Sequence, residues 1–346
     1  MKYPAGIEGD YIKTKKTHLY FDVKGLYHPD DRKICFIRFY PNKNGDRVKD
    51  GTRYKKIYNL QERFSFLKAN YPQYLFYAKE WDLDLQAVKN EDIKQIYSPK
   101  DYFKSLYEKN ELSPNEKVSK TLCELFINNG AIPDDAIGIT GSQMVGLNRN
   151  NSDIDLVIYG TKISLKFQKS LKEIFETPND CRMYNEDEYI TQYNWRVGGS
   201  GIPYKIFLYS ELRKLHQGKY QGTDFFIRYI KSPEDWKGTY YDYRFQNLGR
   251  IHIKAKITDH TNSIFTPCSY IIKPLKIISC SYNEKRTLLE RIREISSYRG
   301  RFCEQAIKDE TVDIYGKLEK VQFKRKLEYF RIVLEDQIID KMIVIT

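Results

Sequence analysis

The sequence predicts a mixed α+β protein in three parts: a basic N-terminal α/β domain (1–112), a central core (113–240) and a basic, β-rich C-terminal domain (241–346). Aromatic and β-branched runs predict strands near the N-terminus, helices and apolar strands alternate in the centre, and short alternating segments follow. The formal net charge of +12 lies outside the centre, because basic and acidic residues balance over 116–240. Basic flanks of this kind suit a polyanion, so RNA or DNA is a candidate partner.

The N-terminal part alternates predicted strands and helices around a basic segment. Thr17–Val23 and Lys33–Tyr40 have the composition of strands, and Leu60–Asn70 and Pro99–Lys109 have that of short amphipathic helices. Lys43–Lys56 is the densest basic stretch, and its Asn-Gly and Asp-Gly pairs are turn signals. Two interpretations stay open, a solvated hairpin loop and a nucleic-acid contact. The residues for that contact are Lys49, Arg53, Lys55 and Lys56.

The central part predicts two helices with strands between them. Ser113-Pro114-Asn115-Glu116 combines an N-cap serine, a first-turn proline and a capping glutamate, so we expect a helix from about Pro114 to Asn129. A second amphipathic helix is expected over Ser164–Phe175. Strands around Ile137–Ile139 and Leu156–Tyr159 are bounded by glycines.

An acid pair precedes the second of these strands. Asp153 and Asp155 are two residues apart, so on a strand both carboxylates point to one face. The two anions repel each other, and a divalent cation such as Mg²⁺ or Mn²⁺, shared with a substrate phosphate, relieves that repulsion. The alternative is a pair of solvent-facing aspartates on an edge strand, and the apolar run that follows Asp155 argues against it.

A glycine-serine turn lies twelve residues before the acid pair. Gly141 allows backbone N–H groups to approach an anion, and Ser142 is expected to cap or open a short helix over Gln143–Leu147. The N-terminus of that helix would face a phosphate. A plain turn glycine and a plain helix cap are the alternative interpretation.

These residues resemble a known superfamily. Gly141-Ser142, Gly146 and Ser152-Asp153-Ile154-Asp155-Leu156 look like the GS…G…SDxDL signature of the polymerase-beta-like nucleotidyltransferases, and more narrowly like an archaeal group of predicted nucleotidyltransferases. The resemblance implies a mixed sheet with flanking helices. It also implies magnesium-dependent transfer of a nucleoside monophosphate from an NTP to a hydroxyl, on a nucleic acid or another acceptor. In that scheme the aspartates bind two metal ions and the glycine-serine turn holds the triphosphate.

The chain departs from the superfamily at the third metal-binding acid. That acid usually lies on a later apolar strand, and the matching run is Tyr204–Tyr209, where Lys205 occupies the expected position. A lysine does not bind magnesium, so its expected role is a phosphate contact within the nucleotide site, with a solvated strand residue as the alternative. Glu188, Glu211 or Asp224 are alternative sources of the third carboxylate.

The C-terminal part predicts a small barrel or sandwich of short strands. The predicted strands are Arg250–Ile257, Val312–Phe323, Tyr329–Leu334 and Met342–Ile345. Segment 284–297 fits either a helix or a strand. Tyr298–Phe302 interleaves two arginines with two aromatic residues, which is compatible with a single-stranded nucleic-acid contact or with an Arg–aromatic stack at a turn.

Several classes of protein are disfavoured. No apolar run approaches the roughly 20 residues that cross a bilayer, and the N-terminus has no apolar signal segment, so we expect a cytoplasmic protein without a membrane partner. The six cysteines form no CxxC pair and the five histidines have no triad spacing, which disfavours a zinc site and a hydrolase triad. Two hypotheses remain: a nucleotidyltransferase, and a nucleotide- or nucleic-acid-binding protein on the same fold that has lost the third acid.

Overall fold

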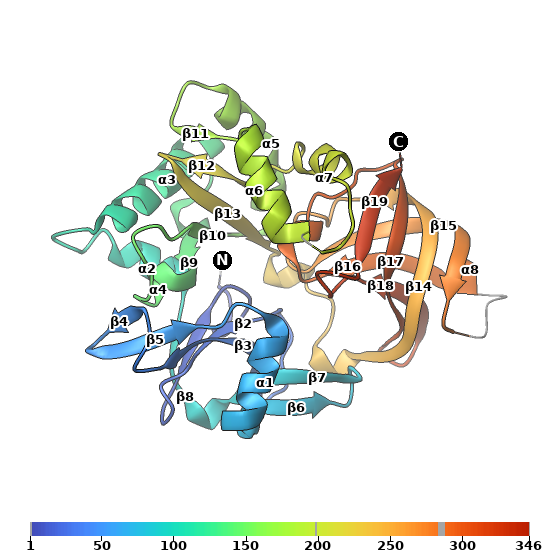
Figure 1. Cartoon of the computed structure of the whole chain (residues 1–346), viewed down its shortest axis with the longest axis horizontal. Helices are drawn as coiled ribbons and strands as arrows, with labels where there is room; N and C mark the ends of the chain where they lie inside the picture. The colour runs from blue at the N-terminus through green and yellow to red at the C-terminus, as the bar shows by residue number, and fades with distance from the viewer. Residues whose placement is uncertain (1, 198, 283–287, 346) are drawn as a thin grey trace. The chain divides into compact units, whose positions relative to one another are not determined.

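The computed structural model describes residues 2–197, 199–282 and 288–345 (Figure 1). The protein is a mixed α+β structure, as predicted. It forms two compact units, the first from residues 1–78, 83–183 and 217–240 and the second from 79–82, 184–216 and 241–346. This division differs from the three predicted parts. The predicted N-terminal domain and most of the core share one unit, whereas 184–216 belongs with the C-terminal residues.

The first unit begins with an antiparallel sheet of order β4-β5-β3-β2-β1-β8, to which β7 and β6 are added beside β3. Its inner face is apolar, because Ile12, Phe21 and Ile37 are completely buried. Helix α1 (Leu60–Asn70) contributes Leu67 to this core. The strands are β1 (Tyr11–Thr14), β2 (Tyr20–Val23), β3 (Arg32–Pro41), β4 (Arg47–Lys49), β5 (Thr52–Lys56), β6 (Leu75–Ala78), β7 (Leu83–Lys89) and β8 (Ile93–Tyr97).

The second sheet of the first unit carries the acid pair. Its order is β11-β12-β13-β10-β9, with β10 parallel to β13 and antiparallel to β9. The strands are β9 (Ile137–Thr140), β10 (Ile154–Tyr159), β11 (Cys181–Arg182), β12 (Gln217–Tyr220) and β13 (Thr223–Ile230). The predicted strands at 137–139 and 156–159 are therefore confirmed.

Helices cover this second sheet. Helix α3 (Pro114–Gly130) begins at the predicted capping box of Ser113 and Glu116, and α5 (Thr161–Glu176) follows β10, so both predicted helices are confirmed. Phe126 of α3 lies 5.0 Å from the ring of Phe167 on α5 and 5.8 Å from that of Phe225 on β13. Helix α2 (Pro99–Ser105) is shorter than predicted and packs beside β9, where a Cβ on Gly138 would lie 2.5 Å from the Pro99 backbone.

The second unit is dominated by a curled sheet, which fits the predicted β-rich C-terminal domain. Its order is β14-β15-β16-β18-β17-β19, and β14 also pairs with β17. Figure 1 shows β14 beside β15. The strands are β14 (Tyr243–Asp259), β15 (Cys268–Cys280), β16 (Ile292–Ser297), β17 (Thr311–Phe323), β18 (Leu327–Val333) and β19 (Lys341–Ile345). The core inside the curl contains Ile253, Tyr270, Ile295, Ile314 and Ile332, each at most 1% exposed.

The structure corrects one predicted strand and resolves one segment that the sequence left open. The strand expected over Tyr204–Tyr209 is wrong, because these residues lie in helix α7 (Tyr204–Glu211), which follows α6 (Glu186–Val197). Phe207 and Glu211 are buried four residues apart, so tertiary packing selects the helical period for a run whose composition also suits a strand. The ambiguous segment 284–297 contains both types, since α8 (Leu288–Arg291) leads into β16, while 283–287 lie outside the described residues.

The arginines of Tyr298–Phe302 hold chain segments together. Arg299 Nε donates to the Glu335 carbonyl, and Arg301 donates to the carbonyls of Arg196 and Gln337. Phe302 is buried beneath the Arg301 guanidinium. Arg301 therefore makes the predicted Arg–aromatic stack, whereas Arg299 is held by a backbone carbonyl, and a nucleic-acid contact of this segment stays a prediction. None of the helices among the described residues is long and apolar enough to span a membrane.

Candidate functional site

The structure brings the glycine-serine turn against the acid pair. Asp155 on β10 lies opposite Thr140, the last residue of β9, and α4 (Gly141–Met144) starts directly after it. Gly141 has φ +76°, and a Cβ there would lie 2.2 Å from Asp155 Oδ2. Only glycine allows this backbone conformation and this close approach of a carboxylate. This geometry places the turn directly against Asp155, and the role of the turn and of both acids in binding stays a prediction.

Ser142 has a different local role from the one predicted. The residue that precedes α4 is Thr140, and Ser142 lies inside the helix, buried, with its carbonyl accepting from Leu147 N at 2.8 Å. The short helix spans 141–144 and not Gln143–Leu147. The reason is that β9 runs directly into the positive-φ glycine, which leaves no linker for a serine cap.

The two aspartates differ in their surroundings. Asp153 is exposed at the start of β10, whereas Asp155 is half-buried with its carboxylate against the turn. Burial and the neighbouring charge of Asp153 raise the pKa of Asp155 to about 6, against an opposing effect of nearby cations. The raised pKa means that the protein alone stabilises the charged form of Asp155 less well than water does.

Three cationic side chains lie close enough to lower the pKa of Asp155: Arg228 on β13, Lys56 on β5 and Arg38 on β3. Burial and the charge of Arg38 lower the pKa of Lys56 to about 8, while both aspartates act in the other direction. The acid pair therefore lies in an electrostatic pocket that strands from both sheets of the first unit build.

A buried ion network anchors two of these cations. Arg228 Nη1 pairs with Glu8 and lies 4.0 Å from Asp22 Oδ1, while Arg38 Nε lies 3.8 Å from Asp22 Oδ2. Lys24 Nζ bridges both acids, at 3.2 Å from Glu8 and 2.8 Å from Asp22. Burial alone would raise the pKa of Asp22, but the charges of Lys24, Arg228 and Arg38 lower it to about 2. Glu8 and Asp22 are at most 4% exposed, so their charges depend on these partners.

The predicted nucleic-acid residues of the basic hairpin separate into different roles. Lys49 Nζ donates to the Val145 carbonyl at 2.9 Å, and Arg53 donates to the Gly45 carbonyl at 2.9 Å, so both make intramolecular bonds. Lys56 Nζ lies over the Tyr58 ring, 4.8 Å from its centroid, and its charge interacts with both aspartates, whereas Lys55 is exposed. The hairpin of β4 and β5 confirms the predicted turn at Asp50-Gly51. Contact of these four residues with nucleic acid stays a prediction.

The same hairpin holds the loop that follows the glycine-serine turn. Besides Lys49, Arg47 Nη1 donates to the Leu147 carbonyl at 2.6 Å, and Arg149 is ion-paired with Asp46. Arg47 and Lys49 of β4 thus bind two backbone carbonyls of the loop at 145–149. These bonds help to hold the preceding glycine-serine turn in position.

Strand β13 supplies the third carboxylate nearest in register to the pair. Ile154, the first residue of β10, is level with Phe225 of β13, so Asp153 and Asp224 each directly precede the first residue that pairs these two strands. Asp224 Oδ2 lies 3.8 Å from Lys219 Nζ. Across the residues that the structure covers, no three His, Cys, Asp or Glu side chains come together as a metal-binding group.

Lys205 lies outside this arrangement. It is an exposed residue of α7, which belongs to the second compact unit, whereas the aspartates belong to the first. Its expected strand position beside the acids is wrong, because the strand beside β10 is β13. A phosphate contact by Lys205 stays a prediction.

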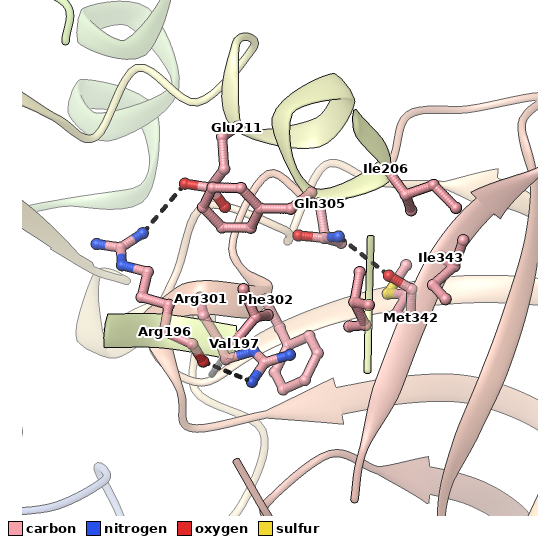
Figure 2. Close-up of a pocket in the computed structure, with 11 residues that line it drawn as sticks. Arg196, Val197, Ile206, Glu211, Arg301, Phe302, Gln305, Met342 and Ile343 are labelled. Carbon is pink, nitrogen blue, oxygen red and sulfur yellow. Dashed lines mark hydrogen bonds and ion pairs between the residues drawn. The ribbon is translucent and has the colours of Figure 1, made fainter. Parts of the chain in front are cut away.

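A small hollow within the second unit is not a candidate functional site (Figure 2). Its free space is about 20 Å³, which is room for about one water molecule. Its charged groups are satisfied internally: Arg196 pairs with Glu211 at 3.2 Å, and Lys214 pairs with the same carboxylate at 2.5 Å. Figure 2 also shows Arg301 directed at the Arg196 carbonyl.

Sequence reasoning missed Arg38, Arg228, Glu8 and Asp22. The available signal was a single arginine in the middle of each of two apolar runs, ICFIRFY and DFFIRYI. A charged residue within a strand that is otherwise apolar indicates a buried partner of opposite charge. The identity of that partner depends on the tertiary structure.

Comparison with known proteins gives one informative relative. The chain is 28% identical to the "Uncharacterized protein MJ1086" of Methanocaldococcus jannaschii over 333 residues, which is 94% of this chain and 94% of the relative. No protein family and no solved structure matches the chain significantly. The similarity therefore extends through both units.

The first prediction concerns the buried network. Replacement Arg228→Met leaves Glu8 and Asp22 short of positive charge in a buried place, so we expect the free energy of unfolding to fall by about 3–5 kcal/mol. Urea denaturation followed by circular dichroism measures it. The matched control is Arg293→Met, an exposed arginine of β16, with a change within about 0.5 kcal/mol. Adding Glu8→Gln to Arg228→Met should recover part of the loss, and no recovery would contradict the proposed pairing.

The second prediction concerns pH. Because the pKa of Asp155 is raised in the folded protein, its charge destabilises the fold above that pKa and has no such effect below the pKa of the unfolded chain. Relative to wild type in EDTA, Asp155→Asn should therefore gain free energy of unfolding as pH rises through about 6. Urea unfolding between about pH 4 and pH 8 measures the difference. Asp134→Asn, at an exposed position, is the control, and a gain that is the same at every pH would contradict this assignment.

Proposed function

We propose that the chain is a divalent-cation-dependent nucleotidyltransferase that moves a nucleoside monophosphate from an NTP to a hydroxyl acceptor. The observation that carries the proposal is the contact of Gly141 with the Asp155 carboxylate, which joins the phosphate-sized turn and the acid pair into one site. The resemblance of the GS…G…SDxDL residues to the polymerase-beta-like superfamily supports the same conclusion.

The residues present fit a hard divalent cation in donor type. Asp153 and Asp155 are a repelling carboxylate pair, and Asp224 lies near the start of the neighbouring parallel strand. The two aspartates of the pair would hold Mg²⁺ or Mn²⁺, and Asp224 would have to approach them to act as a third ligand. The cation would supply activation of the acceptor hydroxyl and stabilisation of the leaving pyrophosphate.

The protein's own residues have distinct tasks in this proposal. Gly141, without a side chain, allows the turn to lie against the Asp155 carboxylate, and its backbone N–H groups would have to reach a phosphate from a buried position. Lys56 places a positive charge beside the acid pair, where it would offset the charge of the triphosphate. Arg38 and Arg228 stabilise the charged form of Asp155, and their own positions are set by Asp22 and Glu8. Arg38 and Arg228 are therefore positioning residues.

A second candidate function is nucleotide binding without catalysis. The observation that favours it is the lack, within the described ranges, of three converging metal-ligating side chains. Arg228, Lys56 and Arg38 also offset the charge of Asp155 already, which lowers its demand for a metal ion. The two candidates differ in one residue, because only the enzyme requires the Asp224 carboxylate.

The third prediction tests catalysis. Wild-type protein with Mg²⁺ or Mn²⁺ and each α-³²P-labelled NTP should label an acceptor among mixed RNA, DNA and the protein itself. Asp153→Asn, Asp155→Asn and Asp224→Asn should each lower the rate by at least about a hundredfold, since each removes a metal ligand. Asp134→Asn is the matched control and should retain the wild-type rate. Labelling that survives the Asp153→Asn and Asp155→Asn double variant would exclude the enzyme. Retained NTP affinity with no labelling in the wild type would favour the binding protein.

The fourth prediction separates two adjacent lysines. The charge of Lys56 interacts with both aspartates and Lys55 is exposed, so the two lysines form a matched pair with the same chemistry in different places. Lys56→Gln should weaken NTP binding by at least about tenfold, measured by titration calorimetry, because a charge-assisted contact with phosphate is worth about 1.5–3 kcal/mol. Lys55→Gln should leave the affinity unchanged. Equal effects of the two substitutions would remove Lys56 from the site.

A further inference from the structure

The second unit carries a lysine-rich face that the proposed nucleotide site does not use. On β14 and β15, Lys254 is directly opposite Lys276, and Lys256 is directly opposite Lys273. Like charges in directly opposed positions of an antiparallel pair destabilise a sheet. The fold therefore places two pairs of like charges on one surface. A negatively charged partner bound there would reduce their repulsion.

The charge of this face is largely uncompensated within the chain. Lys254, Lys273 and Lys276 are exposed, and none of them makes an ion pair with any residue of the described ranges. Lys256 is ion-paired with Asp309 at 2.8 Å. Asp313, which is opposite Lys254 on β17, is itself bound to His252 Nε2 at 2.5 Å.

Apolar side chains lie on β15 among these lysines. Ile271 is 40% exposed, Leu275 is 49% exposed and Ile278 is 45% exposed. A surface that binds only phosphates, as on a duplex, gains nothing from exposed aliphatic groups. Unstacked bases have apolar faces, so this mixture suits a single strand.

The topology of the sheet supports the same partner. The strand pairings run β14-β15-β16-β18-β17 and return to β14, with β16 and β18 parallel and the other neighbours antiparallel. This is the strand order of the OB-fold, a Greek-key barrel in which the face of the second and third strands binds oligonucleotides. In that order β15 is the second strand, and it carries Lys273 and Lys276.

Protection of a sheet edge is the competing explanation. Among the described residues, β15 pairs with β16 only through Cys268–Ile271, and lysines and Pro274 on the remaining edge would discourage aggregation. That explanation does not cover Lys254 and Lys256. Their strand pairs with β15 on one side and with β17 on the other, so it has no open edge there.

We propose that this lysine face binds single-stranded nucleic acid. It is formed by Lys254, Lys256, Lys273 and Lys276 with Ile271, Leu275 and Ile278. The lysines contact the phosphates and the aliphatic side chains contact the bases. The proposal is independent of nucleotidyl transfer, because it concerns the second unit and requires neither aspartate of the first.

Fluorescence anisotropy with a labelled single strand of about 16 nucleotides, as RNA and as DNA, tests the proposal on the full-length protein. The variant is K254Q/K273Q/K276Q. The matched control is K166Q/K169Q/K172Q, which makes the same charge change on exposed positions of α5. The lysine-face variant should bind at least tenfold more weakly than the control. The slope of log K against log salt should fall by about 2, since each phosphate contact on a single strand contributes about 0.7.

Two further measurements separate the alternatives. Leu275→Ser should weaken binding without changing the salt slope, because it removes an uncharged contact. Urea unfolding of K254Q/K273Q/K276Q should show a midpoint at or above that of wild type, because the repelling pairs are gone. Equal binding by the two triple variants would overturn the proposal, as would a duplex bound as tightly as its single strand. An unfolding midpoint below wild type would show that the lysines are structural and would overturn it as well.

Discussion

The arrangement of the first unit depends on the burial of Arg228 between acids that come from distant parts of the chain. Arg228 lies on β13, pairs with Glu8 near the N-terminus and approaches Asp22 of β2, while its charge also acts on Asp155 of β10. A buried guanidinium without such partners would be strongly unfavourable. The network therefore ties the N-terminal sheet to the sheet that carries the acid pair, and the two fold as one unit rather than as the two predicted domains.

The same network gives the site its electrostatic character. Acids and cations alternate from Glu8 and Asp22 through Arg228 and Arg38 to Asp155, so the charge of the acid pair is balanced in part before any ligand arrives. This balance has two consequences for function. It keeps a carboxylate in place for a metal ion, and it reduces the free energy that the metal ion would gain there. The two proposed roles, catalytic and purely binding, differ in whether Asp224 joins Asp153 and Asp155 as a metal ligand.

The second unit distributes its charge in the opposite way. In the first unit, half-buried cations are paired with buried acids, whereas on β14 and β15 lysines face one another in solvent. The first pattern fixes a structure and the second leaves charge available to a partner. The proposed nucleotide site and the proposed strand-binding face are compatible in one chain, since a nucleic acid can serve both as a bound strand and as a hydroxyl acceptor.

The sequence alone determined the elements with strong local signals. The capping box of Ser113 and Glu116 specified α3, the apolar runs specified β9 and β10, and Gly141 with Asp155 marked the site, because each signal depends on neighbours in the sequence. Tertiary structure decided that Tyr204–Glu211 is a helix and that β13 is the neighbour of β10. It also decided which charges meet Asp155. The pairing of Glu8 with Arg228 spans 220 positions of the chain, and no local pattern encodes a contact that only the packed sheets create.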